Sequence, residues 1–424
     1  MIPGMPTALT NWAGSHTYRA ARVHHPATVD ELRALLASAR NLRVLGTRHT
    51  FTAIGDADEL VSLAGLPSAV AVDPAGATVA CGAATTYGEL APVLEAHGLA
   101  LPALASLPHI SVAGAIATAT HGSGDAHGNL ATAVVELELV TSEGDVVAVR
   151  RGDAAFPGAV VHLGALGAVT RVTLATQPAV PLTQRVFEGM PWDALLEHLD
   201  AIFAAGDSVS VFTRWGADVD QVWVKRRGAD TPAPEFFGAR AAIVDRHPIL
   251  ELDPANCTAQ LGRPGPWWDR LPHFRLDSRP SAGEELQSEY FVGRADARAA
   301  IAAVRAIGGR LRPLLLVSEL RTIAGDDLWM SPHHTRDSLG IHFTWRRDPA
   351  GVGAVLPAVE DALAPFGARP HWGKVFAAPP PRPERAGDFE RLAAELDPRG
   401  LFRNAWWEAW RQGESPLAAT GFSG

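Results

Sequence analysis

Two short stretches in the second half of the chain place charged and polar side chains two residues apart. Glu319 and Arg321 in LLLVSELRTI, and His342 and Thr344 in LGIHFTW, have the spacing that puts both members of a pair on one face of a strand. The Glu–Arg pair could be an ion pair on a solvated face. The preceding run LLLV indicates burial on both sides, however, and buried charges need partners. The two pairs therefore favour a polar site on a sheet.

Two more stretches supply side chains of the same kind. LQSEYF puts Gln287 and Glu289 on one face of a strand, and RPHWGKVF brings His371 and Lys374 together beside a glycine and a tryptophan. Gln, Glu, Arg, His, Thr and Lys can hydrogen-bond a polyhydroxylated molecule at many points, but they offer few apolar anchors. This set therefore favours a sugar-like substrate over a fatty or aromatic one.

The first half of the chain contains two glycine-punctuated stretches, VLGTRHT and ISVAGAIATATHGSG. Backbone without side chains can approach a ligand closely, and successive N–H groups in such turns can bind anions. Two such loops suit a dinucleotide, although neither has the Rossmann or P-loop spacing. Glycine-rich turns can also be purely structural. His49, in the first stretch, is either a hydrogen-bonded turn residue or a nucleophile that attacks an electrophilic cofactor carbon.

The elements that would position these residues alternate between helices and short strands. An amphipathic helix is expected over residues 28–40, with Thr28 as its cap, and a hairpin over 133–149. Pro178 and Pro181 indicate a domain boundary. The second half alternates strands and helices, and residues 388–398 are expected to form the final helix. The fold class predicted is α+β in two domains, the second built on an antiparallel sheet flanked by helices.

Composition excludes several classes of function. The 424 residues exceed the usual size of one core, which favours two domains. The net charge of -9, without a basic cluster, argues against nucleic-acid binding. Two distant cysteines exclude a disulfide framework, and the 16 histidines lack metal-ligand spacing, so no metal site is predicted. No apolar run of membrane-spanning length or signal-like N-terminus is present, so a cytoplasmic protein without membrane association is expected.

Several motifs in their order along the chain resemble one family. VLGTRHTF, ASLPHISVAGAIATATHGSG, GALGAVT, ELRT, HFTW and RPHWGKVF are similar to the alditol oxidases, bacterial flavoenzymes of the vanillyl-alcohol-oxidase type, and TNWAG, LPHFR and LQSEY agree as well. The resemblance implies an FAD-binding domain over residues 1–178 and a substrate domain over 179–424, whose sheet covers the flavin. The segment from about 376 to 424 could pack back on the FAD domain.

The resemblance also assigns roles to individual residues. It implies covalent attachment of FAD through His49, with His342 as the catalytic base and with Arg321 and Lys374 stabilising negative charge. The substrate-binding residues that it implies are Ser106, Gln287, Glu319, Arg321, Thr344 and Lys374. The other residues that it implies in cofactor binding are Val44, Leu45, Gly46, Thr47, Arg48, Thr50, Ser106, Ser111, Gly114, Thr118, Ala119, Thr120, His121, Val169, His371 and Lys374.

The attachment loop departs from the family pattern. Arg48 stands where glycine usually precedes the histidine, and Thr50 and Thr52 stand where serine and asparagine often follow. The cation of Arg48 could bind the pyrophosphate or crowd the loop.

The implied reaction oxidises the terminal primary hydroxyl of an alditol such as xylitol or sorbitol to the aldose, with O2 as acceptor and H2O2 as product. The expected partners are a polyol and O2, and a monomer is expected. A sugar-1,4-lactone oxidase or dehydrogenase is the nearest alternative, since such enzymes share the Glu-x-Arg pair and the His-Trp-Gly-Lys run. A flavin-binding protein without turnover is a second alternative.

Overall fold

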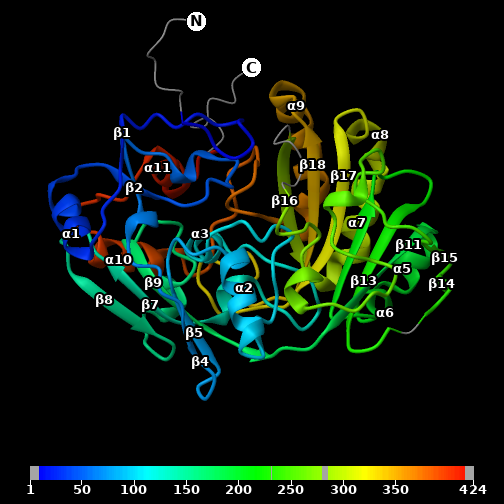
Figure 1. The fold of residues 1–424 in the computed structure, drawn as a ribbon. Coiled ribbons are helices and arrows are strands. Elements are labelled where there is room, and N and C mark those ends of the chain that lie inside the picture. Colours follow the sequence, from blue (N-terminus) through cyan, green and yellow to red (C-terminus); the bar gives the residue numbers. More distant parts are fainter. Residues whose placement is uncertain (1–8, 231, 279–284, 416–424) are drawn as a thin grey trace, which may run out of the picture.

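A computed structural model describes residues 9–230, 232–278 and 285–415, so residues 1–8 of the N-terminal segment considered above lie outside the described part. The first half of the chain forms two sheets (Figure 1). One is parallel, with the order β1-β3-β2, and consists of β1 (Arg22–His24), β2 (Leu42–Leu45) and β3 (Glu59–Ser62). The other is antiparallel, with the order β4-β5-β9-β7-β8, and consists of β4 (Ala71–Asp73), β5 (Thr78–Gly82), β7 (Val134–Val140), β8 (Val146–Arg150) and β9 (Ala168–Ala175).

Short helices connect these strands. They are α1 (Val29–Ser38), α2 (Tyr87–Ala96), α3 (Val112–Ala117) and α4 (Phe156–Ala159). Thr28 caps α1 by accepting a hydrogen bond from the amide of Glu31, as the sequence predicts. The second glycine-rich stretch was expected to be a loop, but α3 forms part of it. A pair of short strands, β6 (Leu99–Ala100) and β10 (Gln177–Pro178), closes this half of the chain.

The second half forms one antiparallel sheet of nine strands with the order β14-β15-β11-β13-β12-β17-β18-β16-β19. Its strands are β11 (Leu182–Met190), β12 (Ser208–Thr213), β13 (Val219–Arg227), β14 (Glu235–Phe236), β15 (Ala239–Ala241), β16 (Glu285–Gly293), β17 (Leu315–Ile323), β18 (Ser338–Arg346) and β19 (Arg369–Pro370). Its helices are α5 (Trp192–Glu197), α6 (Leu199–Phe203), α7 (Ala297–Ala306), α8 (Gly308–Leu311) and α9 (Pro349–Leu363).

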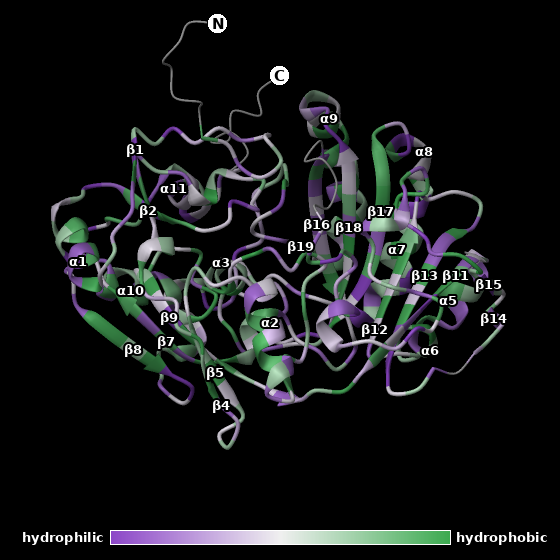
Figure 2. Ribbon diagram, viewed as in Figure 1, coloured by the Kyte–Doolittle hydropathy of each residue, from purple (hydrophilic) through white to green (hydrophobic). Residues whose placement is uncertain are grey.

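The strands of the large sheet alternate between apolar and polar side chains, and Figure 2 shows mixed colours along them. Ile341, Phe343 and Trp345 of β18 are fully buried in the core. This confirms that they share one face, which leaves His342 and Thr344 on the other. Because one face of the sheet packs against the core, the polar face is free to form a site.

The C-terminal segment lies among elements of the first half of the chain (Figure 1). It contains α10 (Ala386–Leu396) and α11 (Ala405–Gln412). The expectation that the chain's final helix ends near residue 398 was wrong, because α11 follows and buries three tryptophans. Arg399 donates to the carbonyls of Leu36 and Ser142, each at 2.8 Å, and Asn404 donates to that of Asp56 at 2.8 Å. No helix in the described ranges is long and apolar enough to cross a membrane.

Candidate active site

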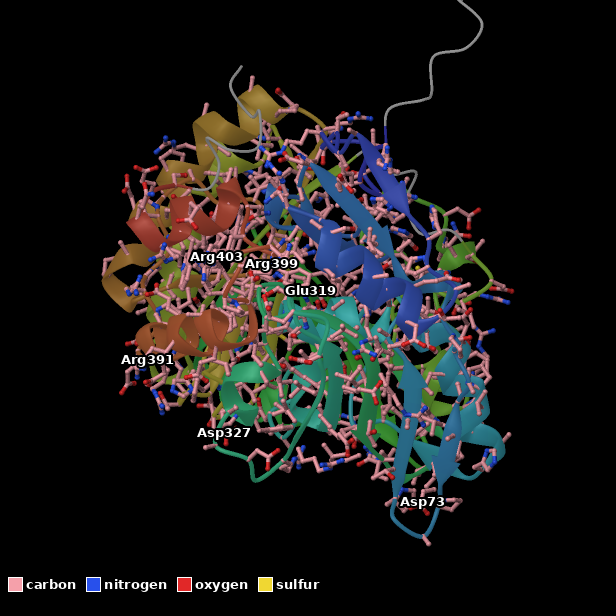
Figure 3. The ribbon with its side chains drawn as sticks, turned by 90° about the vertical axis from the view of Figure 1, so that its left-hand side faces the viewer. Asp73, Glu319, Asp327, Arg391, Arg399 and Arg403 are labelled. Atoms are coloured by element: carbon pink, nitrogen blue, oxygen red, sulfur yellow. The ribbon has the colours of Figure 1, made fainter. Side chains whose placement is uncertain are left out.

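A cavity of about 280 Å³ lies between the glycine-rich loops of the first half and the polar face of the nine-stranded sheet. Glu319 lies in the interior of the molecule, whereas Asp73 lies at the tip of the β4–β5 hairpin (Figure 3). The predicted site residues that line the cavity are Val44, Leu45, Gly46, Thr47, Arg48, His49, Thr50, Ser106, Ser111, Gly114, Thr118, Thr120, His121, Gln287, Glu319, Arg321, His342, Thr344, His371 and Lys374. Ala119 and Val169 are buried in the core and do not line it.

Strand register brings the polar pairs together. Strand β18 lies between β17 and β16. His342 is directly opposite both Glu319 on β17 and Glu289 on β16, so three charged or polar side chains form one row across the sheet. Thr344 is opposite Gln287 in the next row. Each strand places its polar side chains on one face, and antiparallel pairing of β16, β18 and β17 puts these side chains next to one another. Together they form a continuous polar surface.

Glu289 is the centre of the charged contacts on this surface. Its side chain is almost fully buried, and its Oε1 lies 3.1 Å from His121 Nε2 and 2.9 Å from Arg321 Nη2. Its Oε2 lies 3.3 Å from His342 Nδ1. Burial raises the pKa of Glu289, but its interactions with His121, Arg321 and His342 outweigh that effect and hold the pKa well below its usual range. Glu289 is therefore a carboxylate that orients three side chains.

His342 has a partner at each ring nitrogen. Nδ1 faces Glu289, and Nε2 lies 3.3 Å from the hydroxyl of Thr344. Burial lowers the pKa of His342, and the anion of Glu289 opposes that shift. The imidazole is therefore neutral at pH 7. With its proton on Nδ1, towards Glu289, the ring presents Nε2 as a base.

Glu319 and Arg321 form a second group of contacts. Oε1 of Glu319 accepts a hydrogen bond from His273 Nε2 at 2.8 Å and lies 3.5 Å from Arg321 Nε. Arg321 also donates to the hydroxyl of Ser106 at 3.3 Å, which connects the sheet to a loop of the first half. Burial raises the pKa of Glu319, but Arg321 and His273 lower it to a value well below that of a free carboxyl. Both charges of the Glu-x-Arg pair are thus retained inside the protein.

Lys374 approaches the same cavity from the loop after β19. Its ammonium donates to the side-chain carbonyl of Gln287 and lies 5.3 Å from the ring centroid of Phe51. Burial lowers the pKa of Lys374 to about 8. The amide of Phe51 donates to the carbonyl of Gly373 at 2.7 Å, so the lysine loop and the His49 loop are held together.

His49 lies in a turn directly after β2. Its Nδ1 is 3.0 Å from the hydroxyl of Thr47, and the ring of Trp12 stacks on its imidazole at a centroid distance of 5.6 Å. Burial, followed by the charge of Lys374, lowers the pKa of His49 to about 4. The ring is therefore a neutral, nucleophilic imidazole at pH 7.

Arg48 occupies a backbone conformation that favours glycine, with φ of 63°. This geometry explains why glycine usually precedes the histidine in the family that the sequence resembles. An arginine in this conformation carries about 1 kcal/mol of strain. Its guanidinium donates to the carbonyl of Thr10 at 2.9 Å. The side chain thereby connects the N-terminal segment to the loop that contains His49.

The two glycine-rich stretches form a cradle whose surface has no room for extra atoms. A Cβ on Gly114 would lie 2.8 Å from the Ser111 hydroxyl, and one on Gly46 would lie 3.1 Å from the same oxygen. The amide of Ser111 donates to the hydroxyl of Thr47 at 3.2 Å, which joins the stretches. A backbone-lined cradle, threonine hydroxyls and a neutral histidine at the rim fit a flavin dinucleotide. Among the described residues, no group of His, Cys, Asp or Glu side chains could hold a metal ion.

Sequence analysis did not assign roles to two residues of the site. For Glu289 the sequence predicts only that it shares a strand face with Gln287, although the Gln-x-Glu alternation is a signal for it. His273 lies in the motif LPHFR, which resembles the family, but its segment is irregular and has no periodicity that would indicate a role. Its position between Glu319 and the buried Lys225 depends entirely on tertiary structure.

Comparisons with known proteins agree with this arrangement. Residues 20–150 match the FAD binding domain family, and residues 284–410 match the D-arabinono-1,4-lactone oxidase family. A cholesterol oxidase from B. sterolicum has the same fold, with a TM-score of 0.76 at 16% identity over 97% of this chain and 99% of that one. The protein is therefore an FAD-dependent oxidoreductase with the two-domain α+β fold of the vanillyl-alcohol-oxidase type.

Full-length relatives define the family more narrowly. The chain is 47% identical to an alditol oxidase of Streptomyces sp. (strain IKD472 / FERM P-14339), over 95% of this chain and 98% of that one. It is 28% identical to an L-gulono-1,4-lactone dehydrogenase of Mycobacterium tuberculosis, over 93% and 97% of the two chains. It is 26% identical to the L-gulonolactone oxidase of Mus musculus, over 94% and 97%. The chain belongs to the alditol oxidase family.

Proposed function

We propose that the protein oxidises the terminal primary hydroxyl of an alditol to the aldehyde, with FAD as its cofactor and O2 as the electron acceptor. The observation that carries this proposal is the polar surface formed by β16, β17 and β18, which faces the glycine-rich cradle across one cavity. Its carboxylates, imidazole, hydroxyl and amide can accept or donate hydrogen bonds to several hydroxyls of one chain. The relative at 47% identity supports the choice of an alditol.

His342 is proposed as the base that takes the proton of the reacting hydroxyl. Its Nε2 faces Thr344, and Nδ1 faces the anion of Glu289, which stabilises the imidazolium as it forms. A positioned base of this kind contributes roughly 10²–10⁴-fold to the rate. The neutral state that burial imposes on His342 is the state that this role requires.

Arg321 and Lys374 are proposed to stabilise the negative charge that develops as the proton leaves. Arg321 is buried and Lys374 is half-buried, and they lie on opposite sides of the His342 row, in contact with Glu289 and with Gln287 respectively. Removing one such preorganised donor typically costs about 3–4 kcal/mol of barrier. The remaining proposed substrate ligands, Ser106, Gln287, Glu319 and Thr344, would hold the other hydroxyls and so fix the reacting carbon.

FAD, when bound, would supply the redox chemistry, which is hydride removal from the alcohol carbon and return of the two electrons to O2 as H2O2. The cradle of Val44–Thr50 and Ser111–His121 is proposed to hold the dinucleotide, and His49 is proposed to attach it covalently. Support for attachment comes from the low pKa of His49, which leaves a ring nitrogen free to bond, and from Trp12, which holds the ring in place.

We assign FAD binding to residues 1–178 and substrate binding to residues 179–424, with the segment from about 376 contributing to the FAD half. The contacts of Arg399 and Asn404 with Leu36 and Asp56 support that contribution. The cytoplasmic location and the monomeric state predicted from the sequence remain predictions. Fractionation of cells and sedimentation of the purified protein test them.

The function is tested by mixing the purified protein with polyols in the absence of oxygen. Xylitol and sorbitol should bleach the blue absorption band of the bound flavin, and readmitted air should restore the band and release H2O2. The L-gulono-1,4-lactone substrate named in a 28%-identical relative serves as the competing compound. Bleaching by the lactone but by no polyol would replace the proposal with lactone oxidation, and bleaching by neither would indicate a flavin protein without this activity.

A further inference from the structure

A buried lysine lies behind the proposed substrate site. Lys225 of β13 is fully buried, in a strand between β11 and β12. Its Nζ donates to the carbonyls of Leu271 and Pro272, at 2.5 and 3.2 Å, and lies 3.2 Å from Nδ1 of His273. An ammonium has three donors and no acceptor. The three partners therefore use all three N–H groups.

These contacts determine where His273 carries its proton. An ammonium can only donate, so Nδ1 of His273 must accept from Lys225, and the proton of the neutral ring is on Nε2. Burial, followed by the charge of Lys225, lowers the pKa of His273 to about 4, so the ring is neutral at pH 7. Nε2–H then donates to Oε1 of Glu319 at 2.8 Å. A chain of donors runs from Lys225 through His273 to Glu319.

The chain occupies one oxygen of Glu319 and leaves the other available. The contacts from His273 and from Arg321 both reach Oε1. Within the described part of the chain, no hydrogen bond or ion pair reaches Oε2, and Glu319 lines the cavity. A carboxylate whose one oxygen accepts a hydrogen bond from His273 and forms an ion pair with Arg321 presents its second oxygen in a fixed direction.

We propose that Lys225 is a positioning residue for polyol binding: through His273 it orients Glu319 so that Oε2 accepts a hydrogen bond from a substrate hydroxyl. The inference rests on the proposed function, because it requires Glu319 to bind the polyol. The alternative is a purely structural role, in which Lys225 only clamps the segment 271–273 against β13.

The proposal predicts a specific kinetic effect for Lys225→Met, which keeps the length of the side chain and removes its donors. KM for xylitol should rise about tenfold, the loss expected for one hydrogen bond to a charged group, while kcat changes less. In a Glu319→Gln background the same substitution should add little further change. Arg226→Met is the matched control, since this neighbour lies on the other face of β13 and donates to the carbonyl of Ala205, and its KM should match that of wild type.

The pH dependence of KM gives a second readout, because it follows the protonation of Lys225; the Glu319→Gln background is the comparison that separates orientation of Glu319 from a clamp on segment 271–273. Burial lowers the pKa of Lys225 to about 7, so the ammonium is lost as the pH rises through that value. The ratio of KM between Lys225→Met and wild type should therefore be largest at pH 6 and fall towards one above pH 8. The groups that face Lys225 and could shift this midpoint are Glu319, Arg321, Cys257, Arg270 and His273.

An unchanged KM in Lys225→Met, or an equal further rise of KM in the wild-type and Glu319→Gln backgrounds, would overturn the proposal. If Lys225→Met does not fold, a neutron structure of the wild-type enzyme tests the proposal instead. A deuteron on Nε2 of His273 supports the series of hydrogen bonds from Lys225 to Glu319, and a deuteron on Nδ1 contradicts it. Failure of the proposed function would look different, since no polyol would then reduce the wild-type flavin.

Discussion

Replacing Glu289 by glutamine tests whether this carboxylate stabilises the proposed base. Glutamine keeps the shape of the side chain and removes its charge. Glu289 Oε2 lies 3.3 Å from His342 Nδ1, and Oε1 contacts Arg321 and His121. Without the anion, a proton on His342 loses its closest compensating charge, so the step that protonates the imidazole becomes more difficult.

The size of the effect follows from the distance. Two unit charges 3.3 Å apart interact by about 5 kcal/mol at an effective dielectric constant of ~20, from 332/(20 × 3.3). The charge centres lie further apart than these two atoms, so this value is an upper limit. At about 1.4 kcal/mol per factor of ten in rate, a decrease in kcat of roughly 10²–10³-fold is expected.

The assay is stopped-flow reduction of the bound flavin by xylitol without oxygen, with flavin content measured from the absorption spectrum. Removal of the Glu289 anion also lowers the pKa of His342 further. The pH at which kcat/KM falls on the acid side of its profile should therefore decrease. The control is Glu188→Gln, which removes one partner of the outer Arg246 ion pair and should leave the rate unchanged. A Glu289→Gln enzyme with full flavin content and a rate within about threefold of wild type would refute this role.

Five other substitutions test separate parts of the site and fold. His49→Ala should yield a protein whose acid precipitate is colourless while the wild-type precipitate stays yellow; a colourless wild-type precipitate would contradict covalent attachment. His342→Ala should lower kcat far more than it raises KM, and Glu319→Ala should mainly raise KM, so equal small effects in steady-state assays would argue against these roles. If protonated Lys374 is required, kcat/KM should fall as the pH rises through about 8. Lys374→Arg should move this fall in kcat/KM to higher pH. If the fall occurs at the same pH in Lys374→Arg, Lys374 is not the group that titrates. Arg43→Met removes a buried guanidinium that donates to the carbonyls of four residues, and the free energy of unfolding in urea should decrease by about 2–5 kcal/mol; no change would mean that these bonds contribute nothing net.

Local sequence patterns predicted much of the fold. The cap at Thr28, the hairpin over 133–149 and the alternation in β18 all depend on residues close together in the chain, and the structure confirms each of them. Helix α11 was missed because it follows a helix end and a turn, and its three tryptophans are buried only by contacts with distant elements. Helix α3 was missed because its small residues are also typical of a loop.

The sequence by itself determined which side chains face the site, because alternation along a strand and the special needs of a glycine-rich turn are properties of the local backbone. Glu319 and Arg321 share a face whatever their strand pairs with. Only the tertiary structure decided that Glu289 and Glu319 both lie opposite His342, and that His273 reaches Glu319 from an irregular segment. The physical reason is that strand order and register are set by long-range pairing and core packing, which no short window of sequence contains.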